Sequence, residues 1–225
     1  MKKAVVLLSG GLDSATTLFY ALDRGYKPSC LIFRYGQRHQ KEIRCAKAVA
    51  RAGGCSYRLL DLPMPWKGSA LLDHNMSLPD GRRRRSSEIP ATYVPARNII
   101  FLSLASGYAE AIGARAVFIG ANAIDYSGYP DCRPEFYRAF QAALRAGTKT
   151  GIRGRPIRIH TPLIRKTKAQ IIRLGMRLKV PYRLTWSCYG GGRRPCGHCD
   201  SCLIRARGFA EAGIMDPILK VGSKE

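Results

Sequence analysis

The sequence predicts an α/β protein with a doubly wound, mostly parallel sheet and a small helical segment bearing cysteines near its C-terminal end. Three observations predict this class: apolar strands alternate with helices, polar residues follow the strands, and four cysteines gather within residues 188–202. At 225 residues, the chain can form one large domain with a full core and a small appendage. We expect the main α/β domain over residues 1–180, and the cysteine-bearing segment over residues 181–225 packed on it.

The first half of the chain alternates between the two kinds of element. Apolar runs predict strands at 4–8, 30–33 and 57–60, and periodic stretches predict helices at 14–24 and 40–52. Gly25 follows the first helix and Gly53-Gly54 the second, at positions where glycine favours the end of a helix.

The second half continues this alternation after a polar loop that contains prolines. The pattern predicts a long apolar helix at 96–112, a strand at 116–119, a helix from Pro134 to Gly147 and a short strand at 158–160. Thr167-Lys168-Ala169-Gln170 has the form of a capping box, which predicts a helix from there to Leu178. Alternating elements of this kind form a parallel sheet with helices on both faces.

Polar residues follow several of the predicted strands. Ser9 comes after the first strand, Tyr35-Gly36-Gln37 after the second and Asn122 after the fourth. In a doubly wound sheet, ligands bind outside the carboxyl ends of the strands, where the strand order reverses. We therefore expect these residues, and those after Thr161, to converge on one crevice.

The segment Ser9-Gly10-Gly11-Leu12-Asp13-Ser14 joins the first strand to the first helix. A glycine-rich loop at the start of a helix directs backbone N–H groups toward one point, which is what a phosphate requires. The segment lacks the Gly-Lys-Ser/Thr ending of a P-loop and the third glycine of a dinucleotide fingerprint. The alternative is an ordinary turn, in which the glycines supply positive φ and Asp13 or Ser14 caps the helix.

The cysteines near the C-terminal end follow the spacing Cys188-x7-Cys196-x2-Cys199-x2-Cys202. Four soft ligands that leave no open position are typical of a structural zinc site rather than a catalytic one. The spacing also permits an iron–sulfur cluster. His198 could replace one cysteine as a ligand, but four cysteines already complete the shell.

Basic residues are in large excess, 38 Lys and Arg against 15 Asp and Glu, which gives a formal net charge of +23. Such a charge attracts polyanions, so nucleic acid is a candidate partner. The alternative is a basic surface on an enzyme that binds ATP and an anionic substrate. The run Arg82-Arg83-Arg84-Arg85 is typical of a solvated loop, and no basic stripe interleaved with aromatic residues is evident.

The sequence predicts a cytoplasmic protein. No stretch has the apolar length of a membrane span, and the apolar run after Lys2-Lys3 is too short for a signal-peptide core. The eight cysteines would then stay reduced, which favours metal binding over disulfides. Cys30, Cys45 and Cys55 fall in or beside predicted core elements and are interpreted as small buried apolar residues.

The glycine loop resembles the Ser-Gly-Gly-x-Asp-Ser loop of the PP-loop ATP pyrophosphatases, which have an adenine nucleotide alpha hydrolase-like fold. Further segments resemble one branch of that class, the QueC family, over residues 3–217: Tyr35–His39, Val94–Asn98, Gly120–Phe136 and Thr185–Tyr189 with the cysteines behind it. The resemblance implies an ATP-dependent ligase in queuosine biosynthesis that turns 7-carboxy-7-deazaguanine and ammonia into the nitrile preQ0. Arg34 departs from the acidic residue that the family carries there.

The resemblance and the side-chain chemistry together assign candidate roles. ATP binding falls to Leu8, Ser9, Gly10, Gly11, Leu12, Asp13, Ser14 and Lys168. Asp13 and Lys168 are also the catalytic candidates, since Asp13 can hold Mg²⁺ and Lys168 can pair with phosphate. Substrate binding falls to Arg97, Asn98, Asn122, Asp125, Tyr126, Tyr129, Asp131 and Arg133. The zinc ligands are Cys188, Cys196, Cys199 and Cys202, with one zinc per chain.

Within the substrate group, the chemistry suggests three kinds of contact. Arg97 and Arg133 can fork onto the substrate carboxylate, because a guanidinium binds a carboxylate through two parallel hydrogen bonds. Asp125 and Asp131 can accept hydrogen bonds from the guanine edge, and Tyr126 and Tyr129 can stack on its plane. The alternative is that residues 127–131 form a turn in which Asp131 caps a helix. Cys132 could act as a nucleophile, but direct attack by ammonia needs none.

Other functions remain open at this point. One is a PP-loop enzyme that adenylates a tRNA base, another a zinc-bearing nucleic-acid module without catalysis, and a third a relative that couples the activated base to a protein amine. The expected partners are small molecules, namely ATP, 7-carboxy-7-deazaguanine and ammonium, and the resemblance suggests a homodimer. Nucleic acid is not the expected substrate, and no membrane association is expected.

Overall fold

A computed structural model describes residues 2–81, 89–124 and 128–219. Its sheet has five parallel strands in the order β3-β2-β1-β4-β5. The strands are β1 (Lys2–Leu7), β2 (Tyr26–Arg34), β3 (Ser56–Asp61), β4 (Ala116–Phe118) and β5 (Arg158–His160). The strand order runs outward from β1 on one side and from β4 on the other, so it reverses between these two strands. This confirms the doubly wound α/β class.

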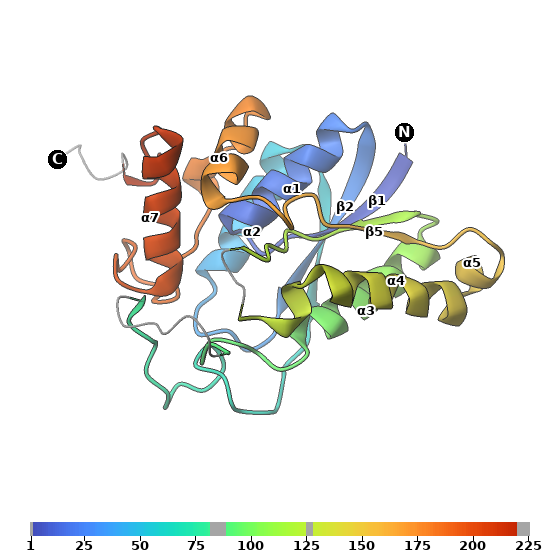
Figure 1. Ribbon diagram of the computed structural model, residues 1–225, viewed down its shortest axis with the longest axis horizontal. Helices are drawn as coiled ribbons and strands as arrows, with labels where there is room; N and C mark the ends of the chain where they lie inside the picture. The colour runs from blue at the N-terminus through green and yellow to red at the C-terminus, as the bar shows by residue number, and fades with distance from the viewer. Residues whose placement is uncertain (1, 82–88, 125–127, 220–225) are drawn as a thin grey trace.

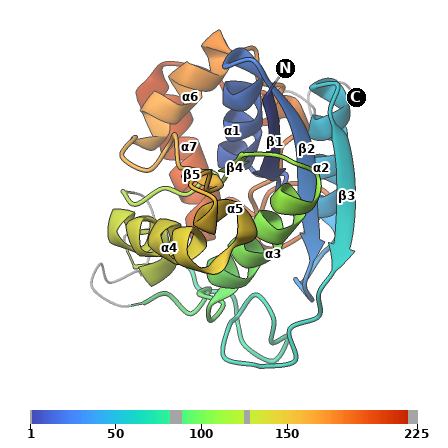
Figure 2. The same cartoon turned by 90° about the vertical axis from the view of Figure 1, so that its right-hand side faces the viewer.

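The helices form two layers, one on each face of the sheet. They are α1 (Leu12–Asp23), α2 (Lys41–Ala52), α3 (Arg97–Ala111), α4 (Pro134–Gly147), α5 (Lys149–Ile152), α6 (Lys168–Arg177) and α7 (Asp200–Ala212), with the 3-10 turns η2 (Pro130–Cys132) and η3 (Tyr182–Leu184). Figures 1 and 2 show α3 and α4 together on one side of the sheet and α1, α6 and α7 on the other. Successive residues of β1 serve the two layers, because side chains alternate along a strand: Val6 faces α1, α2 and α6, while Val5 faces α3 and α4.

Strand β2 begins at Tyr26, four residues before the predicted start at Cys30. Pro28 lies inside it, and proline cannot donate a ladder hydrogen bond. The pairing explains why it is tolerated: β3 joins β2 only from Ser29 onward, so the strand is an edge on that side at Pro28. The short helix α5, which the sequence analysis did not predict, follows α4 directly and begins where the Thr148 side chain accepts a hydrogen bond from the Gly151 N–H at 3.0 Å.

The cysteine-bearing C-terminal segment packs against the main sheet domain. Helix α7 lies beside α6 (Figure 1), and Phe209 of α7 joins the core cluster that contains Val6. The buried Arg205 of α7 forms an ion pair with Asp216 at 2.6 Å and donates a hydrogen bond to the Thr185 hydroxyl at 2.8 Å. The described part of the chain contains no helix long and apolar enough to cross a membrane.

Candidate active site and metal centre

The glycine loop lies between β1 and α1 at the point where the strand order reverses. Gly10 has φ of +85°, and a Cβ there would lie 2.3 Å from the backbone oxygen of Glu42 on α2. A Cβ on Gly120, which follows β4, would lie 2.9 Å from the backbone oxygen of Asp13. Only glycine fits at both positions, since such distances are below ordinary van der Waals contact. The loop is therefore held between α2 and the end of β4.

Serine hydroxyls rather than a helix cap organise the loop. Helix α1 begins at Leu12 after the N-cap Gly11, and no side chain caps it. The Ser14 hydroxyl donates to the Gly11 carbonyl at 3.1 Å and accepts from the Ser9 backbone N–H at 3.2 Å. The first N–H groups of α1 have no partner within the helix, as at every helix start. The loop thus presents donors suited to phosphate. The predicted cap by Asp13 or Ser14 is wrong, whereas Gly10 does supply a positive φ.

Asp13 and Lys168 form an ion pair across the crevice. The Lys168 Nζ lies 2.8 Å from both carboxylate oxygens of Asp13, and the lysine side chain is almost fully buried. Lys168 is the first residue of α6, where the predicted capping box is confirmed: Thr167 Oγ1 accepts from the Gln170 N–H, and Gln170 Oε1 accepts from the Thr167 N–H. The capping box fixes the start of α6 and hence the point from which Lys168 reaches Asp13.

A cavity of about 270 Å³ opens beside the loop, at the carboxyl ends of the central strands. Many of the predicted residues line it: Leu8, Ser9, Gly11, Leu12, Asp13, Ser14, Lys168, Arg97, Asn98, Asn122 and Tyr129. Gly10, Asp131 and Arg133 lie outside the lining, and Asp125 and Tyr126 lie outside the described residues. The expected convergence of Ser9, Tyr35 and Asn122 on one crevice is confirmed.

Arg97 and Tyr129 line the same cavity as the glycine loop. Arg97 starts α3 after Ala96, whose φ is +56°, and its guanidinium donates to the Tyr35 hydroxyl at 3.2 Å. The Tyr129 hydroxyl is 2.6 Å from that of Thr92. Burial raises the pKa of Tyr35 and of Tyr129, so both phenols are neutral hydrogen-bonding groups.

Asp131 and Asn122 have internal partners that explain their positions. The Asp131 carboxylate accepts a hydrogen bond from the Asn98 backbone N–H at 3.1 Å, in the first turn of α3. The Asn122 amide donates to the Leu163 carbonyl at 3.3 Å and to the Lys166 carbonyl at 2.5 Å, which ties the end of β4 to the approach to α6. Arg133 is the N-cap residue of α4. Contact of these three residues with a substrate stays a prediction.

Cys132 lies in the cavity wall but is poorly suited to nucleophilic catalysis. Burial and the neighbouring Asp131 carboxyl raise the pKa of its thiol to about 12, so the thiol is protonated at neutral pH. A thiolate, rather than a thiol, is the nucleophile in cysteine chemistry. This agrees with a reaction in which a small external nucleophile attacks directly.

Several residues of the cavity wall have no role predicted from the sequence, among them Glu42, Trp186 and Tyr189. Glu42 and Trp186 lie in or near the segments that carry the family resemblance, but nothing local to either residue shows that its side chain borders the cavity. Phe101, on the inner face of α3, stacks on Phe33 with ring centroids 4.0 Å apart and forms an apolar wall. These contacts depend on how the helices pack.

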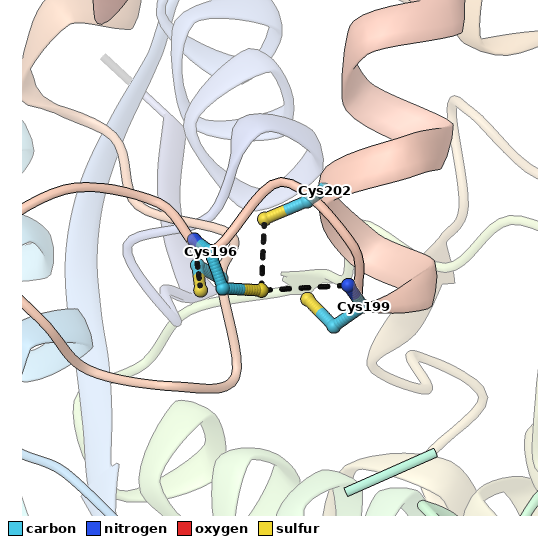
Figure 3. A group of neighbouring side chains, drawn as sticks. Cys196, Cys199 and Cys202 are labelled. Atoms are coloured by element: carbon cyan, nitrogen blue, oxygen red, sulfur yellow. Dashed lines mark hydrogen bonds between the residues drawn. The ribbon is translucent and has the colours of Figure 1, made fainter. Parts of the chain in front are cut away.

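The four cysteines of the C-terminal segment meet in one cluster. Their sulfur atoms all lie within 4.8 Å of one another, and Cys196 Sγ is 3.9 Å from Cys202 Sγ. Figure 3 shows Cys196, Cys199 and Cys202 pointing toward one another, with Cys202 on α7. Zinc–sulfur bonds of about 2.3 Å in a tetrahedron separate the sulfurs by roughly 3.8 Å. Backbone N–H groups of Gly190 and Cys196 also donate to Cys188 Sγ, each at 3.3 Å. The cluster can therefore hold a metal ion.

The cysteine cluster is connected to the glycine loop through Trp186. The Trp186 backbone N–H donates to the Gly10 carbonyl at 2.9 Å, and its indole N–H donates to the Cys188 carbonyl at 2.8 Å. The ammonium of Lys41, on α2, lies 3.5 Å from the centre of the Trp186 ring. The cysteine cluster thus contacts the glycine loop through Trp186, and none of its four cysteines lines the cavity.

A parallel sheet with a Ser-Gly-Gly-x-Asp-Ser loop at its switch point defines the chain as a protein of the PP-loop, adenine nucleotide alpha hydrolase-like class. A solved 4-thiouridine synthetase in complex with RNA and bound ATP shares this fold, with a TM-score of 0.51 and 20% identity; the match covers 98% of this chain and 52% of that one. Residues 3–213 match the model of the family described as "Queuosine biosynthesis protein QueC". The chain belongs to the QueC family.

Similar proteins agree with this assignment over almost their whole length. A protein of Anaeromyxobacter sp. named 7-cyano-7-deazaguanine synthase is 55% identical, and the match covers 98% of this chain and 97% of that one. Proteins with the same name from Thermoplasma acidophilum and Acetivibrio thermocellus are 52% and 54% identical, over 96% and 97% of this chain and 91% and 97% of theirs.

Proposed function

We propose that the protein is a ligase that converts 7-carboxy-7-deazaguanine and ammonia into 7-cyano-7-deazaguanine (preQ0) at the expense of ATP, in queuosine biosynthesis. Membership of the QueC family and the name of its relatives support this. The structural observation that supports it best is one cavity with two functional ends. We assign the glycine loop with Asp13 and Lys168 to one end and the half-buried Arg97 to the other.

The chemistry explains why the site contains these groups. A carboxylate is a poor electrophile because oxide would have to leave. Activation removes this obstacle: the carboxylate oxygen attacks the α-phosphorus of ATP, and pyrophosphate departs. Ammonia then displaces AMP to give the amide. Transfer of a second AMP to the amide oxygen allows that oxygen to leave and forms the nitrile. Positioning and neutralisation of charge are the main demands on the protein.

Each end of the cavity would serve one part of this reaction. The loop residues 8–14 and Lys168 would bind the phosphates, and Asp13 would exchange Lys168 for Mg²⁺, which neutralises charge on the departing pyrophosphate. Arg97, with Arg133, would hold the substrate carboxylate. Asp125 and Asp131 would read the base edge, Tyr126 and Tyr129 would stack on the base, and Asn98 and Asn122 would complete the pocket.

We further propose that the cysteine cluster binds one structural zinc per chain. The sulfur separations and the N–H donors to Cys188 fit a closed tetrahedral thiolate site, which leaves no position for catalysis. Metal analysis of the purified protein tests this, with about one zinc expected per chain. Iron with sulfide, or a folded protein free of metal, would contradict it.

The remaining assignments are also proposals. The proposed division into a catalytic domain, 1–180, and a zinc-binding segment, 181–225, agrees with the packing of α7 on α6. A homodimer is supported by the apolar Ile99 and Leu104, which α3 exposes. Reduced metal-binding cysteines favour the cytoplasm. Nucleic acid is not the proposed substrate, because the cavity is lined by groups suited to small anions.

The direct test is incubation of the protein with 7-carboxy-7-deazaguanine, ATP, Mg²⁺ and ammonium. We expect the nitrile, AMP and pyrophosphate, detected by mass spectrometry and ion-exchange chromatography. An inert free base together with modification of an added tRNA would overturn the proposal in favour of an RNA-modifying enzyme.

A further inference from the structure

Glu42 is a cavity residue to which the proposed reaction has so far given no role. It lies in the first turn of α2, and its backbone carbonyl packs against Gly10 of the glycine loop. Its side chain lines the same cavity as Asp13, Arg97 and Tyr35. Throughout the described chain, no residue forms a hydrogen bond or an ion pair with the Glu42 carboxylate. The carboxylate is therefore an available acceptor inside the cavity.

The ionisable groups around Glu42 come from three other parts of the fold. Burial raises the pKa of Glu42 to about 7, the Arg97 guanidinium on α3 opposes this rise, and the negative charge of the Cys188 thiolate in the segment after η3 adds to it. Tyr35, which follows β2, is neutral and is hydrogen-bonded to Arg97. Glu42 thus lies close enough to Arg97 for the two charges to interact. Its pKa stays raised despite Arg97, so the ionised carboxylate would be stabilised by a further positive charge.

We propose that Glu42 forms the ammonium subsite of the cavity: its carboxylate binds NH₄⁺ and accepts the proton that must leave before nitrogen can attack. The inference rests on the proposed function, because it needs an activated carboxylate as the electrophile. Arg97 holds that carboxylate before activation, so a nucleophile released at Glu42 starts beside the reacting carbon. A carboxylate suits this role since it accepts hydrogen bonds and donates none when ionised.

Proton transfer to Glu42 precedes formation of the C–N bond. One proton of NH₄⁺ passes to a Glu42 oxygen and leaves NH₃ with its lone pair. That pair forms the C–N bond to the carbonyl carbon, and the C–O bond to AMP breaks with its electrons on the phosphate oxygen. A second proton leaves nitrogen with AMP, which gives the neutral amide. Glu42 then returns its proton to solvent before the next cycle.

The test uses Glu42→Gln, with Glu135→Gln on the exposed surface of α4 as the matched control. Two activities are measured on each protein. Exchange of labelled pyrophosphate into ATP, dependent on 7-carboxy-7-deazaguanine, reports adenylation without ammonia. Amide and nitrile formation over a range of ammonium concentrations reports the nucleophilic step. Hydroxylamine, which is uncharged at neutral pH, replaces ammonium in a third measurement that detects the hydroxamate.

We expect Glu42→Gln to retain pyrophosphate exchange and to lose ~10²–10⁴-fold in kcat/KM for ammonium, the usual contribution of a general base. Its rate with hydroxylamine should stay within a few-fold of the wild-type rate, because that nucleophile already has a free lone pair and needs no deprotonation before it attacks. Glu42→Asp should recover part of the ammonium activity, and Glu135→Gln should match the wild type in all three assays.

Three outcomes would overturn the inference. Unchanged kcat/KM for ammonium in Glu42→Gln would exclude a role in the nucleophilic step. Loss of all three activities, namely pyrophosphate exchange, the ammonium reaction and the hydroxylamine reaction, would show that Glu42 positions the substrate or Arg97 instead. An equal loss with ammonium and hydroxylamine, with exchange retained, would exclude proton transfer. Absence of substrate-dependent exchange in the wild type would instead contradict the proposed function itself.

Discussion

The two ends of the cavity are built in different ways. The proposed nucleotide end is a continuous segment, residues 8–14, whose backbone and hydroxyl groups would form the binding surface, with Lys168 added from α6. The proposed base end consists of single side chains from separate elements, with Arg97 from α3, Glu42 from α2 and Tyr129 from the loop before η2. A backbone site depends on local conformation, whereas a side-chain site depends on how helices pack. Substitutions at the two ends should therefore fail in different ways.

Asp13→Asn should have the largest effect and should act at the nucleotide end alone. We expect nitrile formation to fall by at least ~10²–10³-fold, because the carboxylate no longer balances charge at the departing pyrophosphate. The fold should survive, since asparagine has the same size and keeps an acceptor oxygen for Lys168. Turnover and circular dichroism measure the two effects, with Asp23→Asn at the exposed end of α1 as the control. Near-normal turnover would remove Asp13 from the mechanism.

Arg97→Lys should affect the base end and leave the nucleotide end intact. Lysine keeps the charge but loses the forked geometry that matches a carboxylate. We expect KM for 7-carboxy-7-deazaguanine to rise ~10–100-fold, the equivalent of one or two charged hydrogen bonds. Nucleotide affinity, measured by calorimetry in the absence of the base, should not change. Weaker ATP binding would mean that the two ends of the cavity are coupled and do not act independently.

Gly208→Ala, in the proposed zinc-binding segment, should disturb the nucleotide end of the cavity. A Cβ on Gly208 of α7 would lie 2.2 Å from Cγ and 2.8 Å from Cβ of Lys168, so the lysine would have to move. We expect the free energy of unfolding to fall by about 1–3 kcal/mol, the usual cost of overpacking, and KM for ATP to rise while KM for the base stays constant.

The control for this variant is Gly107→Ala in α3. An added Cβ there meets no atom within 4 Å, and alanine favours a helix interior over glycine by roughly 0.5–1 kcal/mol. Gly107→Ala should therefore match or exceed the wild type in stability, with both KM values unchanged. If the two variants behave alike, α7 does not position Lys168.

Replacement of Arg82 to Arg85 by glutamine should have the smallest effect, because neither end of the cavity needs these residues. They lie outside the described residues. Turnover on the free base should remain within a few-fold of wild type. Non-specific RNA binding should weaken, and its dependence on salt should become shallower, because fewer counterions are released. Loss of turnover would show that a surface charge contributes to catalysis.

The order of elements and the glycine loop could be predicted because each depends on neighbouring residues. The elements predicted with bounds lie within a few residues of the observed ones, and Thr167-x-x-Gln170 marks the start of α6 correctly, whereas α5 and the bounds of α7 were not predicted. The partner of Asp131 could not be predicted in this way. Its carboxylate contacts the Asn98 N–H, which the spacing along the chain does not reveal, and whether it also contacts a substrate stays a prediction.

The sequence by itself determined the α/β class, the glycine loop between β1 and α1 and the cysteines that can hold a metal ion, because backbone conformation and ligand spacing are encoded within short segments. Only the tertiary structure decided which side chains meet. Asp13 and Lys168 are 155 residues apart and pair because β1 and the start of α6 face one crevice. Gly208 must be glycine because Lys168 passes over it, and Glu42 borders the cavity because α2 packs on Gly10. Such encounters follow from strand order and helix packing, which no local pattern specifies.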